Sequence, residues 1–253
     1  MKLHYRKYGE GQPMLILHGL FGSSDNWQTL GKNLAQDFEV YLVDQRNHGR
    51  SPRSEEFNYD LMAEDLHELI TDLGLSNVIL VGHSMGGKTI MQFSQNHPEL
   101  IKKMIVVDMG PKKYASHHDS IIEGLKAIDL DVVKSRKEAE NILTQHVPQV
   151  GVRQFLLKNL YWEVPGDQLA WRINIPVLSR ELNHIIDAFH HNIDKTETLF
   201  IRGELSNYIL ESDYNTIKGL YPNSTIETIY GAGHWVHAEK PKEFYEAVIN
   251  FAK

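Results

Sequence analysis

Short runs of apolar residues recur along the chain, and each one stops abruptly at glycine or at polar residues. Runs of this length, rich in β-branched side chains, are typical of strands buried on both faces of a parallel sheet. We predict such strands at Pro13–Leu17, Val40–Val43, Val78–Val81 and Met104–Val107.

Amphipathic segments separate these strands. Between residues 60 and 73 the apolar side chains recur at helical spacing, and Gly74 is a good helix stop. We predict further helices at residues 26–38 and 85–97, the second of which ends before Pro98. Short strands alternating with amphipathic helices indicate an α/β protein whose mostly parallel sheet carries helices on both faces.

This alternation stops after about residue 110. Residues 111–194 hold longer helical segments and several large aromatic side chains, namely Phe155, Tyr161, Trp162, Trp171 and Phe189. The alternation resumes with predicted strands at Thr198–Gly203 and Ile226–Tyr230 and with a last helix that begins at Pro241.

Two units follow from this pattern. We expect residues 1–110 and 195–253 to form the α/β core, and residues 111–194 to form a helical cap inserted into it. The cap is expected over the carboxyl edge of the sheet, which is where ligands bind in open α/β folds.

The strand at Val78–Val81 runs directly into Gly82-His83-Ser84-Met85-Gly86, with a predicted helix after it. Glycine on both sides of the serine lets the backbone double back, so the serine is held at a strained, exposed tip. The helix N-terminus behind the serine favours developing negative charge. We interpret this turn as a nucleophile elbow that presents the hydroxyl of Ser84.

A serine hydroxyl needs an adjacent base at neutral pH. Among 14 histidines, His234 is the best candidate, because it follows the last predicted strand and has flexible glycines beside it. We expect His18 and His83 to hydrogen-bond to the backbone near the site, and His237 to lie in the turn before the last helix. The remaining paired histidines are predicted at solvated helix ends rather than at a metal: His117, His118, His190 and His191.

Composition excludes several other classes of protein. The 253 residues are 42% hydrophobic and 23% charged, as in an ordinary globular domain, and the formal charge of −7 disfavours nucleic acid as a partner. Without cysteine there is no disulfide, thiolate nucleophile or cysteine-bound zinc. The polar N-terminus and the lack of a long apolar run predict a cytoplasmic protein that does not insert into membranes.

The order of these motifs resembles the α/β-hydrolase fold family over essentially the whole chain. More narrowly, the sequence is similar to the small bacterial esterases and acyl-CoA thioesterases typified by YbfF, and to their eukaryotic ABHD11-like relatives. The segments that carry the resemblance are His18-Gly19-Leu20-Phe21-Gly22-Ser23, Asp44-x-Arg46-Asn47-His48-Gly49, Gly82-His83-Ser84-Met85-Gly86-Gly87-Lys88 and Gly231-Ala232-Gly233-His234-Trp235-Val236-His237.

The resemblance implies an esterase that cleaves carboxylic esters or thioesters, acyl-CoA among them. Ser84 would be the nucleophile that forms an acyl-enzyme, and His234 the base. In this fold, backbone N–H groups stabilise the oxyanion. The resemblance assigns this role to Met85 and to Leu20, with Phe21 as the alternative to Leu20. No cofactor or metal is implied.

The sequence departs from the common family pattern at the acid. Most members carry an aspartate in the loop after the penultimate strand, where this chain has Ser206. Glu204 and Asp213 are near but out of register. Some members place the acid after the strand that follows the nucleophile helix, and Asp108 lies there. We therefore expect Asp108 to be the acid, the alternative being that it only caps the start of the insertion.

Two other functions stay open. Carbon–carbon bond hydrolases and lyases of the same fold also use serine, histidine and aspartate, although they mostly keep the acid at the position of Ser206. A receptor of this fold that binds a small molecule without turnover is the second alternative.

Overall fold

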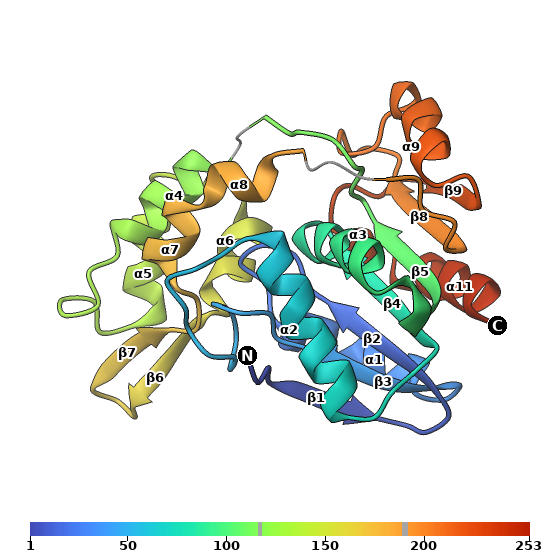
Figure 1. Ribbon diagram of the computed structural model, residues 1–253. Helices are drawn as coiled ribbons and strands as arrows, with labels where there is room; N and C mark the ends of the chain where they lie inside the picture. Colours follow the sequence, from blue (N-terminus) through green and yellow to red (C-terminus); the bar gives the residue numbers. More distant parts are fainter. Residues whose placement is uncertain (116–117, 189–191) are drawn as a thin grey trace.

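A seven-stranded sheet forms the centre of the computed structural model, which describes residues 1–115, 118–188 and 192–253 (Figure 1). Its strands are β1 (Tyr5–Tyr8), β2 (Gln12–Leu17), β3 (Phe38–Val43), β4 (Val78–His83), β5 (Ile101–Val107), β8 (Thr198–Gly203) and β9 (Ser224–Ile229). Their order across the sheet is β1-β3-β2-β4-β5-β8-β9. Strand β1 is antiparallel to β3, and the other neighbours are parallel. The predicted α/β class with a mostly parallel sheet is confirmed.

Helices cover both faces of this sheet. They are α1 (Gln28–Leu34), α2 (Tyr59–Asp72), α3 (Met85–Asn96), α9 (Tyr214–Leu220), α10 (Val236–Glu239) and α11 (Pro241–Ala252). Alternate side chains of β2 show the two layers, because Leu15 packs in one apolar cluster with α2, α3 and α9, whereas Met14 packs in another with α1 and α11. Three 3₁₀ turns complete this part of the chain: η1 (Ser24–Trp27), η2 (Pro98–Leu100) and η3 (Glu211–Asp213).

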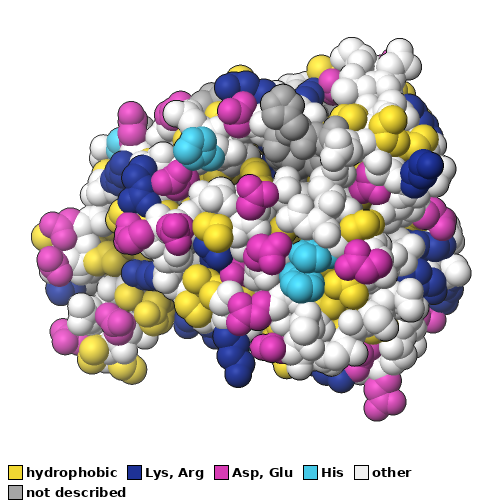
Figure 2. All heavy atoms as spheres, viewed as in Figure 1, with side chains coloured by type: hydrophobic (Ala, Val, Ile, Leu, Met, Phe, Trp, Pro, Cys, Tyr) yellow, Lys and Arg dark blue, Asp and Glu magenta, His cyan; other side chains and the backbone are white. Residues whose placement is uncertain are grey.

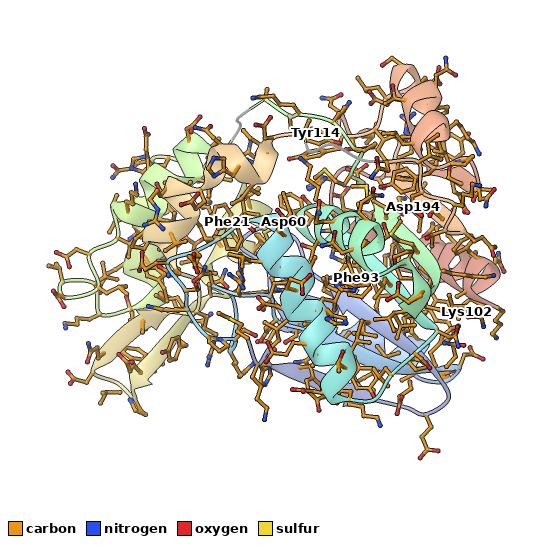
Figure 3. The ribbon with its side chains drawn as sticks, in the orientation of Figure 1. Phe21, Asp60, Phe93, Lys102, Tyr114 and Asp194 are labelled. Atoms are coloured by element: carbon orange, nitrogen blue, oxygen red, sulfur yellow. The ribbon has the colours of Figure 1, made fainter. Side chains whose placement is uncertain are left out.

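The insertion between β5 and β8 gathers to one side of the sheet (Figure 1). It contains α4 (Asp119–Lys126), α5 (Arg136–Leu143), α6 (Val150–Leu157), α7 (Ile175–Arg180) and α8 (Leu182–Ile186), together with a hairpin of β6 (Leu160–Val164) and β7 (Gln168–Trp171). Its apolar cluster also takes in Phe21 and Met85 from the core. Figure 3 labels Phe21 on the side of the sheet that faces the insertion.

Strand β1 and the β6–β7 hairpin have no counterpart in the predicted pattern. Strand β1 reads Tyr-Arg-Lys-Tyr, and most of its side chains are partly exposed, as expected for an edge strand. Most of β6 is exposed as well. Neither element has the apolar run that marks a buried strand. Every helix that the structure describes is too short or too polar to cross a membrane.

Candidate active site

Ser84 lies in the tight turn between β4 and α3. Its backbone angles are φ 53° and ψ −117°, a conformation that is uncommon for a residue with a side chain. A Cβ at Gly82 would lie 2.3 Å from the carbonyl oxygen of Gly86, and one at Gly86 would lie 2.5 Å from that of Leu17. Both positions therefore require glycine, and the close approach of backbone to backbone fixes the turn.

Ser84 and His234 line the same cavity, which has a volume of about 570 Å³. Ser84 is 9% exposed, and its backbone N–H donates to the carbonyl of Val107 over 3.0 Å, which anchors the turn to β5. His234 follows β9 and is partly exposed. Ser84 and His234, which are 150 positions apart in the sequence, thus line one cavity beside the sheet.

Asp108 supports the imidazole of His234. Nδ1 of His234 donates to Oδ2 of Asp108 over 2.7 Å, and the Asp108 side chain is fully buried. The backbone N–H of Gly203 donates to the other carboxylate oxygen over 3.1 Å. Asp108 directly follows β5, and its φ of 48° is a strained conformation that these contacts hold in place. The bond to Nδ1 leaves Nε2 as the ring nitrogen that can accept a proton.

Two contacts around this pair were not predicted from the sequence. The hydroxyl of Ser206 donates to Oδ2 of Asp108, the same oxygen that faces His234. The ring of Tyr208 stacks on that of His234 with centroids 3.9 Å apart and planes 17° apart. The backbone N–H of Tyr208 donates to the Ser206 hydroxyl over 3.2 Å. The loop after β8 therefore contacts both the carboxylate of Asp108 and the imidazole of His234.

The other two acids considered from the sequence bind elsewhere. Oε2 of Glu204 accepts from the backbone N–H of Gly231 over 2.9 Å. Oδ2 of Asp213 accepts from the backbone N–H of Leu210 over 2.8 Å and pairs with Lys112. Asp108 is the carboxylate that contacts the imidazole.

Buried histidines surround the site in their neutral form. Nε2 of His83 donates to the carbonyl of His234 over 2.9 Å. Nε2 of His18 accepts from the backbone N–H of Gln45 over 3.0 Å, so its Nδ1 donates to the carbonyl of Gly19. Burial lowers the pKa of both imidazoles below the usual value. Both side chains hydrogen-bond to backbone, as we expected.

His237 is buried in α10, stacked on Trp27 with centroids 4.0 Å apart. Burial, with a smaller effect of nearby His234, lowers the pKa of His237 to about 3. His237 lines the cavity as a neutral ring.

The loop after β2 narrows the choice of oxyanion donors. The backbone N–H of Phe21 donates to Nε2 of His48 over 3.2 Å, and Nδ1 of His48 lies 2.9 Å from the carbonyl of Arg46. The N–H of Phe21 is therefore engaged within the protein. Leu20, which lines the cavity, and Met85, the first residue of α3, are the better candidates.

The described lining of the cavity contains no Asp, Glu, Lys or Arg side chain. The insertion supplies an apolar wall made of Ile121, Val147, Pro148, Val152, Phe155 and Leu156. His118 also lines the cavity, although we predicted it at a solvated helix end. His117, Phe189, His190 and His191 lie outside the described residues. The cavity is thus suited to an uncharged, largely apolar group.

Comparison with known proteins agrees with this geometry. A sequence profile of the α/β hydrolase fold matches residues 12–138. The chain is 39% identical to the mouse sn-1-specific diacylglycerol lipase ABHD11, covering 94% of this chain and 80% of the lipase. It is 37% identical to the esterase YbfF of Escherichia coli, covering 94% of this chain and 92% of the esterase.

A solved structure shows the same fold. The structure described as a marine microorganism esterase superimposes with a TM-score of 0.96 and 44% sequence identity, and the match covers 99% of both chains.

Proposed function

Because the chain belongs to the α/β-hydrolase family, we propose that it is a serine esterase that hydrolyses uncharged carboxylic esters. The observation that carries the proposal is that Ser84, on its strained turn, and His234 line one cavity, while buried Asp108 bonds to Nδ1 of His234 over 2.7 Å. Nucleophile, base and orienting acid in this relation are the requirements for acyl transfer through serine.

The reaction has two halves. Oγ of Ser84 attacks the ester carbonyl while Nε2 of His234 takes the hydroxyl proton, and Asp108 stabilises the resulting imidazolium. The backbone N–H groups of Leu20 and Met85 bind the oxyanion. Collapse breaks the bond to the alcohol, which leaves with the proton from His234, and an acyl-enzyme remains on Ser84. Water, deprotonated by His234, then attacks the acyl-enzyme. The bond from the acyl carbon to Oγ breaks, His234 returns the proton to Ser84, and the carboxylic acid leaves.

The cavity lining favours a neutral substrate. A charged group in the cavity would lose its hydration without meeting an opposite charge among the described lining residues. The phosphates of an acyl-CoA would therefore have to stay outside the cavity, with only the acyl chain and the thioester inside. We rank neutral esters of apolar acids or alcohols first and acyl-CoA thioesters second.

In this proposal residues 111–194 act as a cap. Its apolar wall lines the same cavity as Ser84, so the insertion contributes to substrate selection, whereas residues 1–110 and 195–253 carry the reacting groups. Carbon–carbon bond cleavage and binding without turnover are the competing functions.

Labelling and turnover together test the proposal. A fluorophosphonate should attach to Ser84, and Ser84→Ala should lose both the label and about 10⁴- to 10⁶-fold in ester turnover. Ser120→Ala is the matched control, because Ser120 lines the same cavity from α4. A folded Ser84→Ala variant that keeps more than a few per cent of activity would refute the assignment.

A substrate panel separates the alternatives. It contains neutral p-nitrophenyl esters, a charged analogue, acyl-CoAs and a 1,3-diketone. We expect the neutral esters to give the highest kcat/KM. Faster cleavage of the diketone would favour carbon–carbon bond hydrolysis, and labelling without turnover of any ester would favour a binding protein.

A further inference from the structure

Three side chains with metal-binding atoms meet on the surface of α2 and α3, away from the cavity. Glu64 and His67 lie three residues apart on α2, and His97 is the C-cap of α3. Nε2 of His97 lies 3.2 Å from Oε1 of Glu64, and Nδ1 of His67 lies 4.0 Å from Oε2. One nitrogen or oxygen atom of each residue lies within 4.8 Å of the others. Figure 2 shows histidine side chains between acidic ones on this face.

The two imidazoles are aligned with each other. The rings of His67 and His97 stack with centroids 3.8 Å apart and planes 3° apart, and each presents a nitrogen to the same carboxylate. The other nitrogen of His97, Nδ1, lies 4.0 Å from Oε1 of Glu99. Histidines that bind metals commonly donate their second N–H to a carboxylate, which fixes the ring and its tautomer. Glu99 would need to move closer to do this for His97, and its exposed side chain is free to do so.

From this arrangement we propose that Glu64, His67 and His97 form a binding site for a divalent transition-metal ion, Zn²⁺ in the first place. Ligand atoms about 2.0–2.2 Å from a tetrahedral ion lie roughly 3.3–3.6 Å from one another. The ligand atoms of the three residues now lie within 4.8 Å of one another and the two rings are parallel, so binding requires side-chain movements that draw the atoms together and tilt the rings towards the ion. The side chains of Glu64 and His67 are 54% and 36% exposed, so they are free to make them.

The donor set selects the class of metal. Two imidazole nitrogens and one carboxylate oxygen suit Zn²⁺, Ni²⁺ or Co²⁺, whereas Mg²⁺ and Ca²⁺ take oxygen ligands. Three protein ligands leave a fourth position for water.

The bound ion joins α2 to the end of α3. Helix α3 is 12 residues long, and Ser84 precedes its other end, so the ion lies roughly 18 Å from the nucleophile. Its expected effect is therefore on stability rather than on the chemical step, and the proposal stands independently of the esterase assignment.

Calorimetric titration of the untagged, chelator-treated full chain with Zn²⁺ tests the site. We expect one equivalent to bind with a dissociation constant in the micromolar range or below, and to raise Tm. His67→Gln and His97→Gln should each weaken the affinity at least tenfold, and Glu64→Gln should weaken it less. Mg²⁺ and Ca²⁺ should give no such binding.

His184→Gln is the matched control. The exposed His184 of α8 also pairs with a glutamate three residues before it, Glu181, over 2.8 Å, but that pair has no second imidazole in it. This variant should bind Zn²⁺ like the wild type. The proposal is overturned if no stoichiometric binding occurs, or if both His67→Gln and His97→Gln bind as tightly as the wild type. In the second case, retained binding together with inhibited ester turnover would place the ion at the active-site histidines. If His97→Gln lowers the Tm of the metal-free protein, the Zn²⁺ affinity of His67→Gln, whose side chain is more exposed, decides between the outcomes.

Discussion

The hydroxyl of Ser206 donates to the same oxygen of Asp108 that accepts from Nδ1 of His234. Ser206 occupies the position at which most α/β hydrolases carry their acid, and Asp108 reaches the imidazole from the neighbouring strand. Because β5 and β8 are adjacent and parallel, the two strand ends bring these side chains together. In the proposed mechanism, the usual position of the acid is thus taken by a serine that donates to Asp108.

Asp108→Asn should lower ester turnover by about 10⁴-fold with little change in Tm. An amide in this place offers Nδ1 of His234 the wrong partner and cannot stabilise the imidazolium, and a loss of this size accompanies the same change in a serine protease. Steady-state kinetics and thermal unfolding of one preparation provide the measurement. Glu204→Gln and Asp213→Asn serve as controls with modest effects. An Asp108→Asn variant with near-normal kcat would reduce Asp108 to a structural residue.

Ser206→Ala should lower ester turnover less than Asp108→Asn does. A hydrogen bond to a charged group contributes about 1.5–3 kcal/mol, which we expect to be divided between stability and kcat. Ser206→Thr keeps the hydroxyl and should recover part of the loss. If Ser206→Ala equals the wild type in both Tm and kcat, the bond to Asp108 contributes nothing measurable.

His234→Ala should abolish turnover and fluorophosphonate labelling, because Oγ of Ser84 then has no base. His237→Gln is the informative comparison, since His237 lines the same cavity three residues later but stacks on Trp27. We expect His237→Gln to keep most of its activity. The reverse outcome, an active His234→Ala with an inactive His237→Gln, would assign the role of base to His237 instead.

The sequence predicts the tight turn at Ser84 well because the residues that shape it lie mostly within the motif itself. Gly82 and Gly86 are required by contacts within a few residues of Ser84 and with the adjacent strand β2. The partners of Asp108, in contrast, come from distant parts of the sequence. Ser206 lies 98 positions away, and only the order of the strands places it there.

The surroundings of the site were the least predictable part. Tyr208 stacks on His234, and His118 lines the cavity, yet neither residue belongs to a motif or a periodic pattern. Their positions follow from how the loop after β8 and the insertion pack, which residue type and spacing do not specify.

Gly82→Ala should abolish activity and lower stability. The added methyl group would lie 2.3 Å from the carbonyl oxygen of Gly86, and the obstacle is backbone, which cannot give way without reshaping the elbow. Gly219→Ala is the control, since a Cβ at Gly219 in α9 meets nothing within 4 Å. That variant should gain about 0.4–1 kcal/mol of stability. Thermal unfolding and turnover of both variants check the contrast, and an active Gly82→Ala would contradict the requirement for glycine.

Acid should destabilise the protein below about pH 6.5 through its buried neutral histidines. Burial lowers the pKa of His48 and of His237 to about 3, from an ordinary value of 6.5. Between these two values the unfolded chain binds protons at both rings and the folded chain does not, so stability is complete above pH 6.5 and falls as the pH drops towards 3.

Each such histidine contributes a slope of up to about 1.4 kcal/mol per pH unit. Urea unfolding at a series of pH values from 7.5 to 4.5 measures this slope. His237→Gln removes one titrating ring and should flatten the curve. Parallel curves for the wild type and His237→Gln would mean that His237 takes up its proton without unfolding, and that its burial against Trp27 does not keep it neutral.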